Sequence, residues 1–431
     1  MSTVIKYVCC RMKTLGSSKQ SFLRLGIGQT LRALPAALSL SKTTVVLMCV
    51  LCTSNVAMAQ HHFQPVLDTL QRQGTKLALL HQQTQTLQSL SAATPLLSDP
   101  NASFEYLWAS RTGEGNRWNV GVSQELPLAQ YGIRHRLRRL IGDSTETSWL
   151  LQRQQWLLEA QHLCAEVVYA NMQLAHLSHC IDMAQRVADA MARRMELGDC
   201  SVIEYNRAQL ELVSLQNKKA VIANHRDNRL SLLHIYGGNA DIALTDTIFP
   251  SITLYDDFDV WYDRACRQAP EIQLKSLQTQ MQYELFRLSK REALPHISAG
   301  FVAAYEADCL FRGLSVGLSL PLWNRHRQVE VARQMWHLAQ QQEIQSEIEF
   351  SGRLRMYYSQ VQSLASEVYR LDALCIQYES ESLLLKSFLL GELSLESYLR
   401  QVEFFHDMRQ TVIDTRYALE CAWLDLMAVT L

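Results

Sequence analysis

Proline is absent from two long stretches of this 431-residue chain, and the absence indicates where long helices can form. The nine prolines lie at positions 35, 65, 95, 100, 127, 250, 270, 295 and 321. Proline in a helix interior costs about 3 kcal/mol. Both proline-free stretches, 128–249 and 322–431, are therefore free to be helical. Each is divided near its middle by a glycine, Gly198 or Gly391.

Acidic residues are absent from residues 1–59, which contain seven Lys and Arg. This segment ends in an apolar core, Val45 to Leu51, followed by the small-residue cleavage signal Ala57-Met58-Ala59 before Gln60. That order is typical of a secretory signal peptide, so we expect cleavage between Ala59 and Gln60. The apolar core is too short to span a bilayer. A retained membrane anchor is the alternative.

Cysteine motifs are absent from the expected mature chain. Seven of the eleven cysteines follow residue 59, an odd number with no CxxC among them. We interpret most of them as small buried apolar residues. A disulfide stays open for an exported chain. Large residues precede Cys49 and Cys52, so no lipid anchor is expected.

Catalytic signatures are missing too, because the chain has no Gly-rich phosphate loop, no HExxH and no GxSxG. His162 with Cys164, and His179 with Cys180, could be offered as metal ligands, but adjacent or i,i+2 positions diverge on a helix. We expect no enzyme, no cofactor and no metal site. The formal net charge is −1, and losing seven cations with the signal leaves about −8. No nucleic-acid partner is therefore expected.

The mature chain contains an internal duplication. Four motifs recur in the same order at offsets of 191 to 195 residues. They are Gln83-Thr84-Gln85 with Gln278-Thr279-Gln280, Leu126-Pro127-Leu128 with Leu320-Pro321-Leu322, Arg134-His135-Arg136 with Arg325-His326-Arg327, and "LGDCSVIEYNR" with "LGELSLESYLR". A tandem repeat of one structural unit is therefore predicted.

Each repeat is predicted to hold a long antiparallel helical hairpin. Apolar residues spaced alternately by three and four run from Ala160 to Met195, and this heptad seam is typical of a supercoiled helix pair. The seam resumes after Gly198, with Ser201 as the expected N-cap. The outgoing helix, Arg134 to Leu197, has 64 residues and so a length of about 95 Å.

Each repeat also carries two segments that alternate with a period of two, the signature of strands with unlike faces. They are Phe104 to Ser110, Trp118 to Leu126, Ile297 to Tyr305 and Leu314 to Leu322, with "RTGEGN" and "EADCLFRG" as turns. Such strands with aromatic ends fit a transmembrane barrel, while a small soluble sheet is the alternative. A membrane barrel needs about eight strands or more. Three chains would supply twelve, so a homotrimer is expected.

The expected organisation is a mainly α chain with a small β part. Residues 1–59 are the signal peptide. The first repeat, 60–237, holds a helix, the strand pair 104–126 and the hairpin 134–237. A linker, 238–262, leads to the second repeat, 263–431, with a helix, the strand pair 297–322 and the hairpin 324–431.

Three segments in this order resemble the TolC family of outer-membrane efflux proteins. They are "SDPNASFEYLWAS", "GDCSVIEYNRAQLEL" and "LPHISAGF…GLSVGLSLPLWNRHRQVEVARQ". The details are most similar to the branch that exports cobalt, zinc, cadmium, copper or silver ions. The resemblance implies a trimeric channel with twelve strands in outer-membrane lipid and a helical tunnel across the periplasm.

The resemblance also implies partners and cargo. A periplasmic adaptor and an inner-membrane pump of the resistance–nodulation–division (RND) type would deliver heavy-metal cations to this passive exit duct. An exit duct for drugs or secreted polypeptides is the alternative within the family. An envelope coiled-coil structural protein is the alternative from another class, but it leaves the amphipathic strands unexplained.

The hairpin tips are the candidate site, since family members dock the adaptor there. The matching tip residues are Leu197, Gly198, Ser201 and Tyr205 with Leu390, Gly391, Ser394 and Tyr398. The glycines and serines also serve the turns, and both tyrosines continue the seam, so a core role is the alternative for them. Asp199 and Glu392 would place six carboxylates at the tunnel mouth of a trimer, as a ring that attracts cations.

Overall fold

The computed structural model describes residues 63–93, 99–108, 116–238, 242–252, 257–306, 309–320, 325–378 and 380–431. Phe63–Leu431 forms one compact unit. The expected cleavage site at Ala59 and Gln60, most of the "RTGEGN" turn and the Pro321-Leu322 junction lie outside the described residues.

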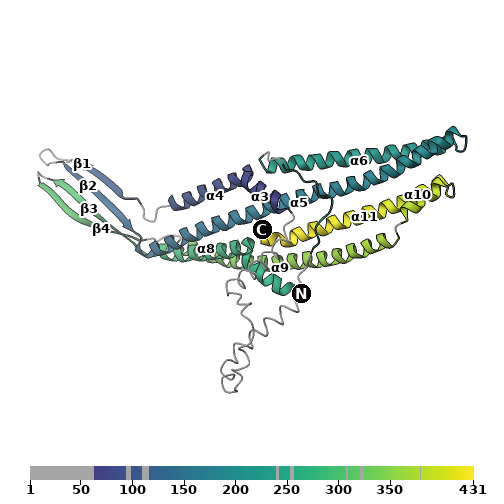
Figure 1. Cartoon of the computed structure of the whole chain (residues 1–431). Helices are drawn as coiled ribbons and strands as arrows, with labels where there is room; N and C mark the ends of the chain where they lie inside the picture. The colour runs from purple at the N-terminus through teal and green to yellow at the C-terminus, as the bar shows by residue number, and fades with distance from the viewer. Residues whose placement is uncertain are drawn as a thin grey trace, which may run out of the picture. The chain divides into compact units, whose positions relative to one another are not determined.

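The unit is mostly helical with one small sheet, which confirms the predicted fold class (Figure 1). The first repeat contains α3 (Gln64–Gln73), α4 (Thr75–Ala93), β1 (Asn101–Leu107), β2 (Arg117–Leu126), α5 (Leu128–Glu196) and α6 (Val202–Tyr236). The second contains α7 (Phe258–Gln268), α8 (Pro270–Glu292), β3 (His296–Glu306), β4 (Cys309–Ser319), α9 (Arg325–Gln377), α10 (Glu381–Leu389), α11 (Leu395–Met427) and the 3-10 turn η2 (Ala428–Thr430).

Helix α5 is longer than the sequence predicts. It begins at Leu128, directly after the strand β2, and runs for 69 residues to Glu196. At 1.5 Å per residue its length is about 100 Å. The prediction began at Arg134, so it missed the first six residues of the helix, 128–133. Helix α6 packs along α5 as the return arm of the first hairpin.

The heptad seam forms the buried side of α5. Val167, Ala170 and Ala188 are at most 1% exposed. A second group on the same helix, Cys164 and Val168, is equally buried. Helix α5 therefore has two covered sides, because α6 packs on it as the hairpin partner and α4, α8 and α11 pack on it as well.

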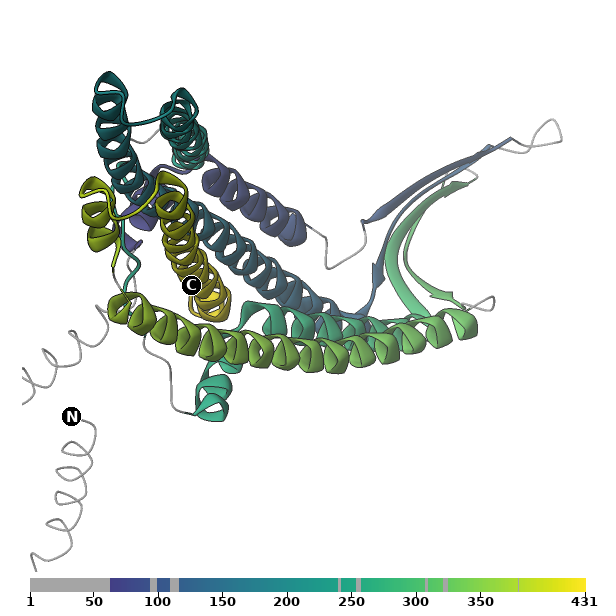
Figure 2. The ribbon, with the colours of Figure 1, turned by 90° about the vertical axis from the view of Figure 1, so that its right-hand side faces the viewer.

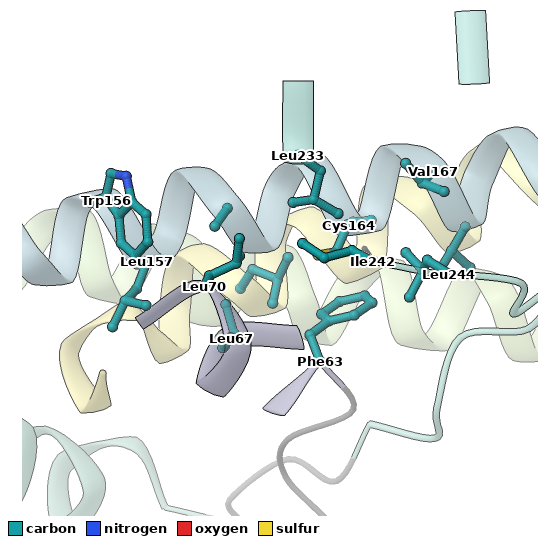
Figure 3. Packing of buried hydrophobic residues seen from close by; sticks show 14 of the residues in the cluster. Phe63, Leu67, Leu70, Trp156, Leu157, Cys164, Val167, Leu233, Ile242 and Leu244 are labelled. Carbon is teal, nitrogen blue, oxygen red and sulfur yellow. The ribbon is translucent and has the colours of Figure 1, made fainter. Parts of the chain in front are cut away.

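The main core of the first repeat joins α3, α5, α6 and the segment that follows α6. Leu67 and Leu70 of α3 face Trp156 and Leu157 of α5 (Figure 3). Residues 242–252, predicted as linker, start on this core with Ile242 and Leu244. The Asn171 side chain fixes them by donating to the Leu244 and Asp246 carbonyls, both at 3.1 Å.

The second repeat has an equivalent core. Trp261 and Ala265 of α7 pack with Phe350 and Leu354 of α9 and with Trp423 of α11. Helix α7 begins at Phe258, inside the predicted linker, where Asp257 caps it by accepting from the Asp259 amide at 3.0 Å. Structure of the second repeat therefore starts before the predicted residue 263.

The second hairpin differs from the prediction in one respect. Only Gly391 was expected to divide it, but α9 ends at Gln377 and α10 begins at Glu381. Neither Tyr378 nor Ser380 is a strong helix breaker, so the sequence on either side does not predict this interruption.

The four strands form one antiparallel sheet in the order β1-β2-β3-β4. Its strands curve together as a single layer (Figure 2). Strand β4 starts at Cys309, in the segment "EADCLFRG" that was predicted as a turn. Cys309, Leu310 and Phe311 pair there with Glu306, Tyr305 and Ala304. Among the described residues, no helix combines the length and the apolar character needed to cross a membrane.

Candidate functional site

The sheet has one continuous apolar face. The register places Phe104 beside Val120, Val122 beside Phe301, and Phe301 beside Leu314. Because side chains alternate along a strand, these residues share a face with their second neighbours. The face comprises Phe104, Tyr106, Trp118, Val120, Val122, Leu126, Ile297, Phe301, Tyr305, Leu310, Leu314, Val316 and Leu318, with Gln124 and Arg312 as polar members.

This apolar face is open in the single chain. Leu314 is 89% exposed and Val316 is 79% exposed. Tyr106, Trp118 and Tyr305 form a cross-strand row of aromatic residues, with the last two stacked at 5.6 Å. An exposed apolar patch of this kind marks a surface that binds another protein or lipid. An aromatic row at one end is typical of a strand that meets a membrane interface.

The opposite face of the sheet consists mostly of small and polar residues, with Leu107, Val302 and Phe311 as its larger apolar members. Gly121, Gly300 and Gly317 lie on it among serines, and a Cβ at Gly300 would collide with the Val122 carbonyl oxygen. Near the aromatic end, the Asn119 amide donates to Glu105 at 3.1 Å, and Arg117 pairs with Glu306 at 3.3 Å. The two faces of the sheet therefore differ in polarity, as in a sheet that has lipid on one side and water on the other.

The two hairpin tips join α5 to α6 and α10 to α11, at the end of the molecule away from the sheet (Figure 1). Both tips have the same backbone geometry. Gly198 and Gly391 have φ angles of 77° and 80°. In the first tip the Gly198 amide donates to Met195 and the Asp199 amide to Arg194. The second tip repeats both hydrogen bonds. This is the Schellman motif, in which glycine takes the left-handed conformation that other residues avoid.

Serine starts the returning helix at both tips. The Ser201 hydroxyl accepts from the Glu204 amide at 3.2 Å, and the Glu204 carboxylate accepts from the Ser201 amide at 2.9 Å. This is a complete capping box. Bonding to Ser201 also lowers the pKa of the Glu204 carboxyl. Ser394 caps α11 more simply, by accepting from the Ser397 amide at 3.3 Å.

An arginine joins the two tips of one chain. The Arg194 guanidinium donates to the Phe388 carbonyl at 3.0 Å and lies 5.1 Å from the centre of the Phe388 ring. Tyr398 is 2% exposed and lies 5.0 Å from that ring. Tyr398 is thus a core residue that supports the tips from within. Tyr205 is half-buried against the same cluster.

The tips expose several apolar side chains at the turn. Leu197 is 78% exposed, Leu390 65% and Ile203 80%. The carboxylates of Asp199 and Glu392 are exposed as well. Each tip therefore offers apolar and acidic groups on a rigid turn.

The pairs His162–Cys164 and His179–Cys180 were considered as metal ligands and rejected from the sequence. The His162 ring instead bonds Asp425 at 2.9 Å, and this contact raises the pKa of His162 to about 10. Burial raises the pKa of the Cys164 thiol to about 12. Over the described ranges, no group of three or more His, Cys, Asp and Glu residues has a geometry suited to a metal ion.

Sequence reasoning predicted unlike faces for the strands from their alternation, but it missed Arg194. Nothing local announced Arg194, because its partner Phe388 is 194 residues away.

Comparisons with known proteins agree on the fold. No protein-family model and no curated protein sequence matches the chain. Solved structures do match. The Campylobacter jejuni outer membrane channel CmeC is similar with a TM-score of 0.69 and 16% identity over 85% of each chain.

Two further structures give the same result. The Vibrio cholerae outer membrane protein VceC has a TM-score of 0.72 and 11% identity, over 85% of this chain and 95% of that one. CusC, whose structures concern folding and transmembrane channel formation, has a TM-score of 0.71 and 12% identity over 86% and 92%. The chain therefore has the fold of the TolC-like outer membrane channels.

Proposed function

We propose that this protein is the outer-membrane component of a tripartite efflux system and acts as a passive exit duct. It is a bacterial outer-membrane homotrimer that extends into the periplasm. The observation that carries the proposal is the two-faced sheet, in which β2 and β4 are each followed along the chain by a long helix, α5 of about 100 Å and α9 of about 80 Å. The fold shared with CmeC and VceC supports the same location.

The sheet edges support the proposed trimer. Strands β1 and β4 each have one partner among the described residues. Open edges are not tolerated in lipid because their backbone groups lack hydrogen bonds. Joining β4 of one chain to β1 of the next closes a barrel of twelve strands, an even number within the known range. The apolar face then contacts lipid, and the face of serines and glycines lines the pore.

The hairpin tips are proposed to dock a periplasmic adaptor that connects the duct to an RND-type pump. The exposed Leu197 and Leu390 supply apolar contact area, and the Schellman turns hold them rigidly. Asp199 and Glu392 from three chains would form the acidic ring at the periplasmic mouth.

The proposed cargo is heavy-metal cations. It is supported by the likeness of the strand and tip motifs to the cation-efflux branch and by the net charge of about −8 after loss of the signal. An envelope coiled-coil role is not favoured, since it gives no reason for an exposed apolar sheet.

The decisive experiment compares arginine on the two faces of β4. Leu314→Arg puts a charge on the apolar face at a cost of about 2–4 kcal/mol near the bilayer midplane. Gly313→Arg puts the same charge on the other face, where a Cβ meets no atom within 4 Å. We expect wild type and Gly313→Arg to migrate as heat-modifiable trimers from outer-membrane fractions, and Leu314→Arg to lose them. A soluble wild-type monomer would refute the assignment.

Cargo and docking need separate assays in cells that lack the endogenous duct. Restored tolerance to zinc, cobalt, cadmium, copper or silver supports metal export. Restored tolerance to drugs alone contradicts it.

Replacing both Asp199 and Glu392 with Ala, or with Gln, tests the acidic ring, and unchanged metal export would refute a role for that ring. Leu197→Asp with Leu390→Asp should abolish cross-linking to the adaptor without loss of the trimer.

A further inference from the structure

One charged side chain lies on the apolar face of the sheet. Arg312 of β4 pairs with Ala303 of β3 and alternates in phase with Leu310 and Leu314, so it shares their face. Its side chain is exposed. Within the described part of the chain, its guanidinium forms no hydrogen bond and no ion pair. Arg312 is therefore a cation without a counterion.

The apolar face itself contains no counterion for this arginine. The carboxylates of the described strands, Glu105, Glu125 and Glu306, all lie in the opposite phase of the alternation and so on the polar face. In the proposed trimer, β1 of the next chain lies beside β4, and its Glu105 is again on the polar face. The strands therefore supply no anion for Arg312, which leaves the surroundings of the sheet as the source.

The position of Arg312 along β4 places it close to the aromatic row. Leu310, two residues away, pairs with Tyr305, which pairs in turn with Trp118. The aromatic row thus lies about 7 Å from Arg312 along the strand. It is at the end of the sheet away from α5 and α9 (Figure 1). In the proposed trimer, this is the outer end of the barrel.

A cation is tolerated on a lipid-facing surface only near an interface. Arginine on the lipid face of a barrel is costly at the bilayer midplane, but its cost falls nearly to zero close to the interfaces. From one row inside the aromatic residues, the long side chain of Arg312 can reach the headgroups while its stem stays among the acyl chains. The anions at that level of a membrane are lipid phosphates.

We propose that Arg312 binds the phosphate of an anionic lipid in the outer leaflet, with one such lipid on each chain. The guanidinium presents its donors as a rigid fork that matches two phosphate oxygens. Trp118 and Tyr305 border the same lipid with amphipathic rings that prefer the headgroup level. The inference rests on the proposed function, because it requires the apolar face to contact lipid. On a sheet covered by water, Arg312 would be solvated and would show no preference for lipid.

The test counts the lipids bound to the purified full chain by native mass spectrometry. The protein in detergent is titrated with phosphatidic acid, which carries an exposed phosphate monoester, or with phosphatidylcholine, in which choline shields the phosphate. We expect wild type to retain phosphatidic acid preferentially, at one molecule for each chain. Arg312→Gln removes the charge and should weaken the binding of phosphatidic acid about fivefold, with no change for phosphatidylcholine.

Arg117→Gln is the matched control. Arg117 lies at the same end of the sheet as Arg312 but on the polar face, where it pairs with Glu306 at 3.3 Å. Its loss removes the same charge without touching the lipid-facing surface. Arg117→Gln should therefore bind phosphatidic acid as wild type does.

The outcomes separate this lipid site from its alternatives. Equal binding of phosphatidic acid by wild type and Arg312→Gln overturns the inference, and so does a wild type that does not prefer phosphatidic acid. Displacement of the lipid by an equal concentration of inorganic phosphate would identify a site for a free anion and would also overturn it. The same spectra report the oligomeric state. A monomeric wild-type chain refutes the proposed function, whereas a trimer without lipid preference refutes only the lipid site.

Discussion

Glu420 of α11 provides a direct test of how burial acts on this fold. It is 3% exposed, and its Oε2 has no hydrogen-bond partner among the described residues. The buried Leu424 and Trp423 follow it on the same helix. Removal from water disfavours the ionised form, and burial raises the pKa of the Glu420 carboxyl from 4.5 to about 7.

The raised pKa fixes the sign of the pH dependence. Below pH 4.5 the carboxyl is protonated in both the folded and unfolded chain, so it contributes nothing. Between 4.5 and 7 the unfolded chain releases the proton first, and stability falls as pH rises. A shift of this size costs about 3 kcal/mol once both states are ionised.

The measurement is urea unfolding of the purified protein in detergent, followed by helical circular dichroism at pH 4 and pH 8. Glu420→Gln removes the ionisation at nearly constant volume. We expect it to stabilise the protein by about 2–3 kcal/mol more at pH 8 than at pH 4. Glu403→Gln, at an exposed position of the same helix, should show no such difference. Equal effects of Glu420→Gln at both pH values would refute the reasoning.

Three further predictions concern the tips. Gly198→Ala should lower the free energy of unfolding by about 1–2 kcal/mol, because φ at this position is 77°. Gly142→Ala is the control: it lies in open space within α5 and should raise the free energy of unfolding by about 0.5–1 kcal/mol. The reverse order in urea titrations would contradict the turn geometry. Ser201→Ala should cost about 1 kcal/mol by removing the capping box, seen as faster hydrogen exchange in the first turn of α6, and unchanged exchange there would argue against it. Arg194→Gln should weaken the link to Phe388 by about 1 kcal/mol and speed exchange in α10 while leaving α6 unaffected; equal acceleration in both helices would indicate a wider change.

Features with a short repeat could be predicted from the sequence. The seam from Ala160 to Met195 identified α5 and its partner, because a period of 3.5 residues is visible within one helix. The alternation of Leu314, Val316 and Leu318 identified β4 in the same way. The turn at Gly391 was equally local, since only the backbone conformation of one residue decided it.

The parts that escaped prediction depend on contacts between residues far apart in the chain. Val168 lies outside the seam, and it is buried in the cluster that joins α5 to α3, α6, the segment after α6 and α11. The interruption before Glu381 has no proline or glycine to mark it, and Glu381 contacts His179, which lies 202 residues away in the chain. Contacts across such distances are set by how the two hairpins pack, and this information is spread over both.

The broken second hairpin has a mechanical consequence. Helix α5 runs without interruption for 69 residues, whereas in the second hairpin α9 ends at Gln377 and the separate helix α10 begins at Glu381. The two outgoing arms therefore differ in continuity. A trimer of this chain would place three continuous and three interrupted outgoing arms around its axis. Bending would then concentrate at the three interruptions and would not be shared equally by all six arms.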